Sequence, residues 1–280
     1  MQIGLLTARF DAKQWPLEKI IAWAGENQID CLEVAVGAHL DAAKLLKDKG
    51  QAALQKKLRA AGVSISSLAF YSTQINSPDA AVRAEQLKTL TAAIDAAESL
   101  GVDVVCALAG MPAPGKTKME TIREDLPEVF GPAIEHAAGR GIRIALENWF
   151  ATNIQHLDHW KALFEVLPQE NFGLNFDPSH LLWQGIDHLG AVAEFAERIF
   201  HTHAKDVAID DAALRRIGVL EGGWWRYTIP GTGRIAWGEF LGKLRRVGFD
   251  GAVSIEHEDA TLGAEEGFRM GAAHLRALIA

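Results

Sequence analysis

Short apolar runs rich in β-branched residues alternate along the chain with longer segments of helical periodicity. This alternation is typical of a parallel sheet whose strands are joined by helices, rather than of separate helical and sheet domains. Eight strand–helix units in 280 residues match the size of a (β/α)8 barrel, so we predict a single TIM-barrel domain over residues 1–280. The expected strands are 3–7, 31–36, 63–70, 102–108, 142–147, 172–177, 199–204 and 252–256.

A repeated local phrase marks where helices give way to strands. In RAAGVSI, ESLGVDVV, AGRGIRIAL and RRVGFDGAVSI, a helical run ends at a glycine just ahead of an expected strand. Glycine permits the left-handed turn that ends a helix. The segment 41–61, in which lysines and an arginine alternate with leucines, is predicted to be a helix with a solvated outer face.

Composition and charge narrow the class of protein. A chain with 49% hydrophobic and 23% charged residues can bury a large core, and its net charge of -8 disfavours nucleic acid as a partner. The first residues lack a signal-peptide pattern, and no stretch approaches the length of a membrane span, so we expect a cytoplasmic protein without a membrane partner. Cys31 and Cys106 lie in apolar runs and are expected to be buried hydrophobes.

Acidic and imidazole side chains stand at the ends of four successive expected strands: Glu147, Asp177, His203 and Glu256. In a barrel the carboxyl ends of the strands surround one pocket. Two glutamates, an aspartate and a histidine suit Mn, Mg, Co or Zn and leave coordination positions for substrate oxygens. Alternatively, each is a separately satisfied polar group that caps the next helix. Their occurrence on four adjacent strands favours the metal site.

Long segments follow the third, fourth and seventh expected strands and should cover the mouth of the barrel. The longest, after the seventh strand, is the candidate lid, because it gathers aromatic residues and an arginine able to stack on a sugar ring and bond its hydroxyls. These residues are Trp224, Trp225, Arg226 and Tyr227. Its PGTG piece lacks the Walker lysine and is expected to be a turn, and Asp206 is expected to orient Lys205 or cap a turn.

The pieces LEN, FDPSH, HTHAKD, IPGTGRIAW and SIEHED resemble the sugar phosphate isomerase/epimerase superfamily, the xylose-isomerase-like barrels, with a weaker likeness in LEVAVGAH. The resemblance implies that one divalent cation, usually Mn, Mg or Co, is held by Glu147, Asp177, His203 and Glu256. It also implies that His180, and an Arg or Lys after the seventh strand, contact substrate oxygens. His203 matches the ligand position because it lies two residues before Lys205, and His201 is the alternative.

Proton abstraction next to a carbonyl needs a positioned base and stabilisation of the enolate oxygen. We therefore expect one of Glu147 and Glu256 to remove the proton and the other, or a water, to return it, while His180 and Lys205 steady the developing charge. The expected substrate is an unphosphorylated sugar, because few basic residues are available at the mouth.

Other candidates around the mouth depend on the barrel prediction. Glu33 and His39, near the end of the second strand, should face the same opening, where His39 could bond a sugar hydroxyl. Trp149 and Trp183 follow the fifth and sixth strands and either wall a sugar pocket or simply pack. Two further expectations are structural: His257 should point away from Glu256, and the pair His156 and His159 lacks carboxylates for a metal site.

The predicted function is a metal-dependent isomerase or epimerase acting on a ketose or keto sugar. The alternative is a lyase on the same scaffold, as in inosose dehydratases and proteins that cleave 3-keto-glycosides, which expels a β-leaving group after the same proton abstraction. Remote alternatives are an endonuclease IV-like phosphodiesterase, whose extra histidines are missing here, and a non-catalytic sugar-binding subunit. A homo-oligomer, dimer or tetramer, is compatible with the resemblance.

Overall fold

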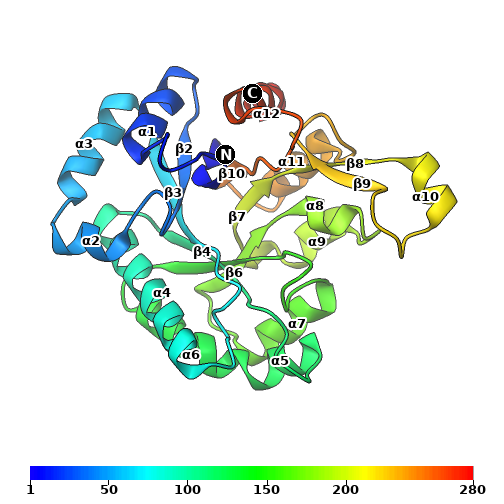
Figure 1. The fold of residues 1–280 in the computed structure, drawn as a ribbon, viewed down its shortest axis with the longest axis horizontal. Helices are drawn as coiled ribbons and strands as arrows, with labels where there is room; N and C mark the ends of the chain where they lie inside the picture. The colour runs from blue at the N-terminus through cyan, green and yellow to red at the C-terminus, as the bar shows by residue number, and fades with distance from the viewer. Residues whose placement is uncertain (280) are drawn as a thin grey trace.

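A computed structural model describes residues 1–279. Its eight parallel strands close into a barrel in the order β1-β10-β7-β6-β5-β4-β3-β2, which confirms the predicted TIM-barrel class (Figure 1). The strands differ from the predicted ranges by at most two residues at either end. They are β1 (Gln2–Leu6), β2 (Cys31–Ala35), β3 (Ser64–Phe70), β4 (Val104–Leu108), β5 (Arg143–Glu147), β6 (Phe172–Phe176), β7 (Ile199–Ala204) and β10 (Ala252–Ile255).

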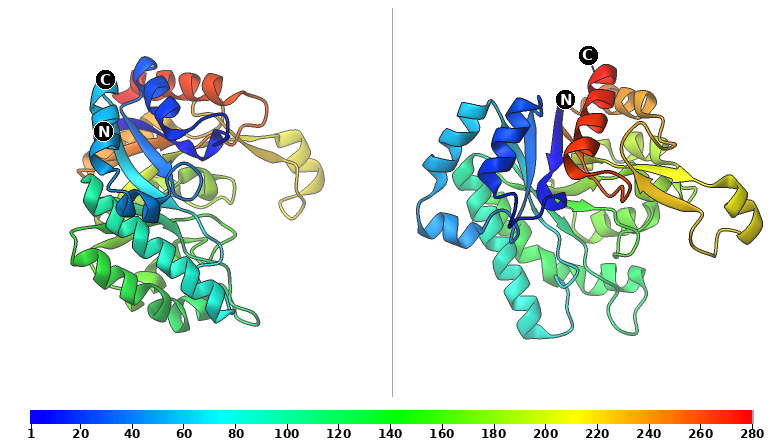
Figure 2. Two further views of the ribbon diagram at one scale, coloured as in Figure 1. Left: turned by 60° about the vertical axis from the view of Figure 1, so that its left-hand side comes forward. Right: turned by 45° about the horizontal axis from the view of Figure 1, so that its top comes forward.

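Helices surround the barrel and bury their apolar faces against it (Figures 1 and 2). The outer helices are α1 (Leu17–Glu26), α2 (Ala42–Lys47), α3 (Gln51–Ala61), α4 (Ala80–Leu100), α5 (Lys118–Glu124), α6 (Leu126–Ala138), α7 (Leu157–Val166), α9 (His188–Glu194), α11 (Trp237–Arg246) and α12 (Ala264–Ile279). Three shorter elements are η1 (Thr7–Arg9), α8 (Pro178–Leu182) and η2 (Ala196–Arg198). Among residues 1–279, no helix is both long and apolar enough to cross a membrane.

The glycines that precede the strands adopt the left-handed conformation that the sequence predicts. Gly62, Gly101, Gly141 and Gly248 have φ values of 68°, 71°, 70° and 84°. A residue with a Cβ would be strained at these positions. Each helix can therefore stop abruptly one or a few residues before the next barrel strand begins.

The segment 41–61 is not one helix. It is divided into α2 and α3, and Lys49, between them, has a φ of 51°. The Asp41 side chain caps α2 by accepting a hydrogen bond from the Lys44 amide at 2.9 Å. A lysine in the left-handed region cannot continue a helix, which is why a continuous pattern of basic residues and leucines misled the prediction.

The segment after β7 forms an arm that projects from the barrel (Figure 2). Antiparallel strands β8 (Asp206–Ile209) and β9 (Trp225–Thr228) make its stem and α10 (Asp211–Ile217) its outer part. Near the tip, Val219 and Leu220 are 68% and 97% exposed. Only the stem lies beside the barrel mouth, so the expected lid is an arm whose outer half extends into solvent.

Asp206 anchors the base of this arm. Its buried carboxylate accepts hydrogen bonds from the amides of Gly231 and Ile235, both at 3.0 Å, and from the Trp237 indole nitrogen at 2.9 Å. The PGTG piece is a turn, as expected: the Thr232 amide donates to the Ile229 carbonyl at 3.0 Å. Of the two roles expected for Asp206, the structure shows the one in turn formation.

Candidate metal centre

Four side chains from neighbouring strands converge at the carboxyl end of the barrel. Glu147 ends β5, Asp177 follows β6, His203 lies in β7 and Glu256 follows β10. One ligand atom from each residue lies within 4.8 Å of the corresponding atoms of the other three. Because these strands are consecutive around the barrel, the closed sheet itself brings the residues together.

Asp177 has one carboxylate oxygen in a helix cap and the other in the cluster. Its Oδ1 accepts a hydrogen bond from the Ser179 amide at 2.7 Å, at the start of α8. The Asn148 side chain holds the Asp177 backbone, donating to its carbonyl at 2.9 Å and accepting from its amide at 2.7 Å. The capping alternative raised from the sequence is therefore correct for Oδ1, while Oδ2 stays free to face the other acidic groups.

Two buried atoms of the cluster have no hydrogen-bond partner: Oδ2 of Asp177 and Nδ1 of His203. From Nδ1 of His203, the nearest carboxylate oxygens of Glu256, Glu147 and Asp177 are 3.1, 3.7 and 3.9 Å away. A buried lone pair without a donor is costly, and this is the case for Nδ1 of His203, while Oδ2 of Asp177 has the Lys205 ammonium 3.2 Å away as an ion-pair partner. A cation would interact favourably with both atoms. The donor set thus fits a divalent ion.

Lys205 supplies positive charge beside the cluster. Its Nζ lies 2.6 Å from Oε2 of Glu256, 3.2 Å from Oδ2 of Asp177 and 3.3 Å from Oε2 of Glu258. Burial alone would lower the pKa of this ammonium, but the carboxylates of Glu256 and Asp177 outweigh it and hold the pKa well above its usual value. Burial likewise raises the pKa of Asp177, and the charges of Lys205 and His180 reverse the shift and lower it. Both groups are therefore ionised near neutral pH.

His180 links the cluster to the arm. Its Nε2 lies 3.1 Å from Oε1 of Glu147 and 3.2 Å from Nζ of Lys205, and its Nδ1 lies 2.6 Å from the hydroxyl of Tyr227 on β9. The ammonium of Lys205 also sits 4.5 Å from the centre of the Tyr227 ring. The structure thus brings His180 and Lys205 to the cluster and adds Tyr227, which the sequence placed only in an aromatic lid.

A cavity of about 450 Å³ opens beside these groups. Its lining residues are Glu256, Glu258, Tyr227, Arg9, His257, Leu6 and Ala8. Nε2 of His257 donates a hydrogen bond to the Gly263 carbonyl, 3.1 Å away, which is a structural role. Glu258, which the sequence analysis missed, has a pKa raised mainly by burial.

Aromatic residues stand next to the cluster on the side of the arm. The rings of Trp183 and Trp225 stack with centroids 4.3 Å apart, and Phe150 meets Trp183 edge-on at 5.1 Å. Trp149 is in edge contact with Phe150 at 6.1 Å. Trp183 therefore stacks on Trp225 of the arm, whereas Trp149 contacts Phe150, the next ring away from the arm.

Two predicted substrate-binding residues do not join this group. Arg226 alternates with Trp225 and Tyr227 on β9, and its guanidinium pairs with Asp259 at 3.1 Å instead. His39 lines a different hollow, between α1, α2 and α3, where its ring nitrogens have no hydrogen-bond partners. The chain reverses direction after β2, which turns His39 away from the mouth that we expected it to face.

A second polar layer lies inside the barrel next to the first. Glu33, Cys106 and His201, all buried, place possible ligand atoms within 4.8 Å of one another. We expected Glu33 to face the barrel mouth, and we did not predict that it would lie beside Cys106 and His201. His201 is not in the four-residue cluster, so the geometry favours His203 over it as a ligand. Among residues 1–279, no metal-capable group includes His156 or His159.

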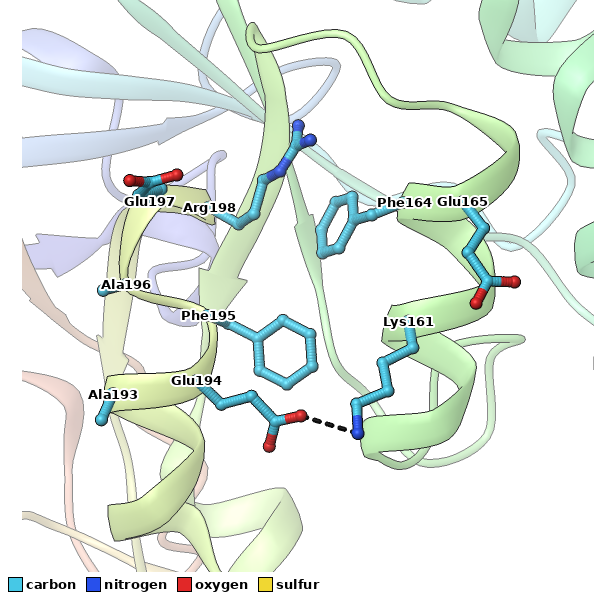
Figure 3. A pocket seen from close by; sticks show the side chains of 9 residues that line it. All are labelled: Lys161, Phe164, Glu165, Ala193, Glu194, Phe195, Ala196, Glu197 and Arg198. Carbon is cyan, nitrogen blue, oxygen red and sulfur yellow. Dashed lines mark ion pairs between the residues drawn. The ribbon is translucent and has the colours of Figure 1, made fainter.

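A separate groove of about 570 Å³ lies outside the barrel, between α7 and the segment from α9 to η2 (Figure 3). An ion pair of 2.8 Å between Lys161 and Glu194 crosses it, and the Arg198 guanidinium lies 4.7 Å from the Phe164 ring centre. The groove has no cysteine, histidine or hydroxyl nucleophile among its lining residues. We therefore place the chemistry at the barrel mouth and not here.

Comparisons with known proteins agree with the fold. A family model described as a xylose isomerase-like TIM barrel matches residues 21–278. The uncharacterized protein YfiH of Bacillus subtilis is 36% identical over 143 residues, which cover 48% of this chain and 45% of that protein. An inosose dehydratase of Geobacillus thermodenitrificans is 30% identical over 128 residues, covering 44% of this chain and 42% of the enzyme. The matches thus span less than half the length of these two relatives.

Solved structures match over the full barrel at lower identity. The IolI protein, solved with a bound zinc atom, has a TM-score of 0.79 at 20% identity, covering 100% of this chain and 98% of that one. D-psicose 3-epimerase, solved in the presence of D-fructose, has a TM-score of 0.74 at 18% identity, covering 100% and 99%. These likenesses show the fold, and by their names D-psicose 3-epimerase and the inosose dehydratases among the sequence relatives are enzymes. From the match over residues 21–278, the chain belongs to the xylose isomerase-like TIM-barrel family.

Proposed function

We propose that this chain is a divalent-metal-dependent isomerase or epimerase that acts on a ketose or keto sugar by removing a proton next to the carbonyl. The observation that carries the proposal is the convergence of Glu147 and Glu256 with two buried ligand atoms that make no hydrogen bond, His203 Nδ1 and Asp177 Oδ2. Oδ2 has the Lys205 ammonium as an ion-pair partner at 3.2 Å. The ion, which we expect to be Mn, Mg, Co or Zn, would polarise the carbonyl and its neighbouring hydroxyl.

The side chains around the cluster support the proton-transfer step. Burial raises the pKa of Glu147, but His180 and His203 outweigh it and lower the pKa well below its usual value, so this carboxylate is ionised near neutral pH, as a general base must be before it takes up a proton. Glu256 stands across the cluster and lines the cavity, where it could deliver a proton to the other face or the adjacent carbon. Lys205 lies 2.6 Å from Glu256 and His180 lies 3.1 Å from Glu147, so these two groups are placed to stabilise negative charge developing on the substrate oxygens.

Charge in the cavity supports a neutral sugar over a phosphorylated one. Glu256 and Glu258 line it, and its lining contains one arginine, Arg9, and no lysine. Arg9 already donates to the carbonyls of Asp259 and Leu262 at 3.4 and 3.2 Å. A phosphate would need several convergent cationic donors. The same lack of basic residues argues against the endonuclease-like alternative.

A lyase is the second candidate, and Glu258 is the observation that favours it. Its pKa is raised by burial while the pKa of the nearby Glu147 is lowered, so one carboxyl can donate a proton while another accepts one. Elimination after the first proton abstraction requires a donor for the leaving group. The 30% identity to an inosose dehydratase is consistent with this candidate.

Exchange of substrate hydrogen with solvent deuterium tests the proposal. The metal-loaded protein should exchange the hydrogen next to the carbonyl of an accepted keto sugar, and Glu147→Gln and Glu256→Gln should abolish the exchange with the metal still bound. Glu221→Gln, on the exposed arm, is the matched control and should leave exchange unchanged. Exchange that persists in both cluster variants would refute the roles of these glutamates.

Product mass separates the two candidates. Epimerisation or isomerisation conserves the mass of the sugar, whereas elimination releases water or a larger fragment. If the chain is a lyase, Glu258→Gln should retain exchange and lose elimination. Ligand binding without exchange or turnover on any unphosphorylated ketose or keto-inositol would instead indicate a sugar-binding subunit.

Self-association remains a prediction. The exposed Val219 and Leu220 at the arm tip are the apolar side chains to examine first. Light scattering across a range of concentrations would report whether the chain forms a dimer or tetramer.

A further inference from the structure

Glu33 is a carboxylate buried without solvent contact in the interior of the barrel. It belongs to β2, and its Oε2 lies 3.0 Å from Nε2 of His203, on β7. Two strands, β1 and β10, separate β2 from β7 around the barrel, so the contact crosses the interior. A buried carboxylate is costly unless it is paired and hydrogen-bonded, and His203 is the nearest group that can carry a matching charge.

The two ring nitrogens of His203 have different surroundings. Around Nε2 lie Oε2 of Glu33 at 3.0 Å, Nδ2 of Asn175 at 3.0 Å and the Tyr71 hydroxyl at 3.1 Å. Nδ1 has no hydrogen-bond partner and faces the carboxylates of the cluster. Nδ2 of Asn175 donates to the Tyr71 hydroxyl at 2.8 Å and so does not need Nε2 as its acceptor. Because a carboxylate oxygen can only accept, the contact with Glu33 then assigns a hydrogen to Nε2. That leaves Nδ1 as the nitrogen available to a cation.

We propose that Glu33 is a positioning residue, which holds the His203 imidazole with its hydrogen on Nε2 and its Nδ1 lone pair directed into the cluster. The inference rests on the proposed metal centre and adds a residue to it. A carboxylate behind a metal-binding histidine fixes the ring and raises its basicity, and loss of such a partner typically lowers metal affinity about 10- to 100-fold.

Glu33 is itself held in place by neighbours that do not touch the cluster carboxylates. The Tyr71 hydroxyl donates to Oε1 of Glu33, and Nδ2 of Asn175 donates to the Tyr71 hydroxyl at 2.8 Å. This chain of hydrogen bonds leaves Oε2 for His203. The orientation of the histidine therefore depends on three side chains from β2, β6 and the end of β3.

The same residues do not form a free second metal site. Glu33, Cys106 and His201 are close enough to hold an ion, but both ring nitrogens of His201 already have partners. Its Nδ1 lies 3.0 Å from Oδ1 of Asn175, and its Nε2 lies 3.2 Å from Oγ of Ser66. An ion would have to displace these hydrogen bonds. Glu33 and its neighbours are therefore better explained as residues that position the His203 ring than as a second metal site.

The affinity of the protein for zinc tests the inference. It is measured without substrate, by competition with a chromophoric chelator. We expect Glu33→Gln to weaken zinc binding about 10- to 100-fold and Tyr71→Phe, which leaves the carboxylate in place, to weaken it less. Cys106→Ser is the matched control, since Cys106 is a buried neighbour of Glu33 in the same layer, and its affinity should stay within about twofold of the original protein. The zinc stoichiometry should be one ion per chain in the original protein and in Cys106→Ser.

A second readout does not depend on metal. In ¹⁵N NMR, the Nε2 hydrogen of His203 should resonate far downfield because it is bonded to a carboxylate, and should move upfield in Glu33→Gln. An unchanged resonance together with unchanged zinc affinity would overturn the inference, as would loss of a zinc ion in Cys106→Ser. If the original protein binds none of Zn, Mn, Mg and Co, the proposed metal centre fails, and the NMR comparison on metal-free protein still decides whether Glu33 holds the ring.

Discussion

The Lys205 ammonium nitrogen lies 2.6 Å from Oε2 of Glu256, in a site from which water is almost excluded. The lysine thereby neutralises part of the charge that the carboxylates bring together at the barrel mouth. A divalent ion and Lys205 would interact with the same carboxylates. Lys205 should therefore contribute more to the stability of the metal-free protein than to that of the metal-bound protein.

Lys205→Met should destabilise the metal-free protein by about 3–5 kcal/mol, because it removes one partner of a buried ion pair and leaves its carboxylates uncompensated. Bound metal should offset much of this loss, so the rise in melting temperature on adding metal should be larger in the variant. Thermal denaturation with and without metal measures both effects. Lys161→Met, which breaks the solvent-exposed pair with Glu194, is the control and should leave the stability nearly unchanged. Equal metal-induced shifts in the original protein and Lys205→Met would contradict the shared-charge explanation.

Asp177 should respond differently to two substitutions, because its oxygens have different partners. Asp177→Asn keeps an acceptor for the Ser179 amide and should lower metal affinity with little loss of stability. Asp177→Ala should lower metal affinity and also cost about 1 kcal/mol through the lost helix cap. Chelator competition and urea denaturation of the metal-free variants measure the two effects. Equal stability of the two variants would show that the cap contributes nothing.

Tyr227 should affect turnover more than Arg226. Tyr227→Phe removes the hydroxyl that meets Nδ1 of His180, and the loss of one such bond, about 1.4 kcal/mol, would slow the reaction roughly tenfold. Arg226→Ala removes a side chain that pairs with Asp259, away from the cluster, and should change kcat/KM by less than about twofold. Steady-state kinetics on an accepted sugar provide the measurement, and a larger effect from Arg226 would place the sugar on the other face of β9.

Buried His201 should make the protein less stable in acid. Burial lowers its pKa to about 4, so in the folded protein it stays neutral at pH values where the unfolded chain, with a pKa near 6.5, binds a proton. The unfolded state therefore takes up more protons, and stability should fall as the pH drops from about 6.5 to about 4, by roughly 3 kcal/mol from this residue. Above pH 6.5 this residue should not make the free energy of unfolding depend on pH. Urea denaturation across this range should show a smaller slope in His201→Gln, and an unchanged slope would assign the acid sensitivity to other groups.

The sequence predicted the fold well because both of its signals are local. Apolar runs mark strands that are buried on both faces, and the glycines before them mark where helices stop. The four cluster residues were visible for a related reason: each stands at or near the end of such a run, and a barrel gathers those ends at one rim. The pieces around Asp177 and His203 also carried the family resemblance.

The parts that the sequence could not predict depend on which way individual side chains point and on where the chain turns. Whether Arg226 or Tyr227 faces the cluster is decided by the register of β9 against β8, and neighbouring residues of a strand point to opposite sides. His39 is lost from the mouth because the chain turns back after β2. The support of His203 by Glu33 joins strands that are 170 residues apart in the sequence, and no local pattern reports such a pair.

The attachment of the arm at Asp206 separates two parts of the molecule that could otherwise disturb one another. One carboxylate fastens the root of the arm to the turn at Gly231 and to Trp237, while the outermost residues contact little else. Changes in the length or composition of the tip need not propagate to the reacting groups. The outer half of the arm can therefore differ in length or sequence without moving the four residues of the candidate metal centre.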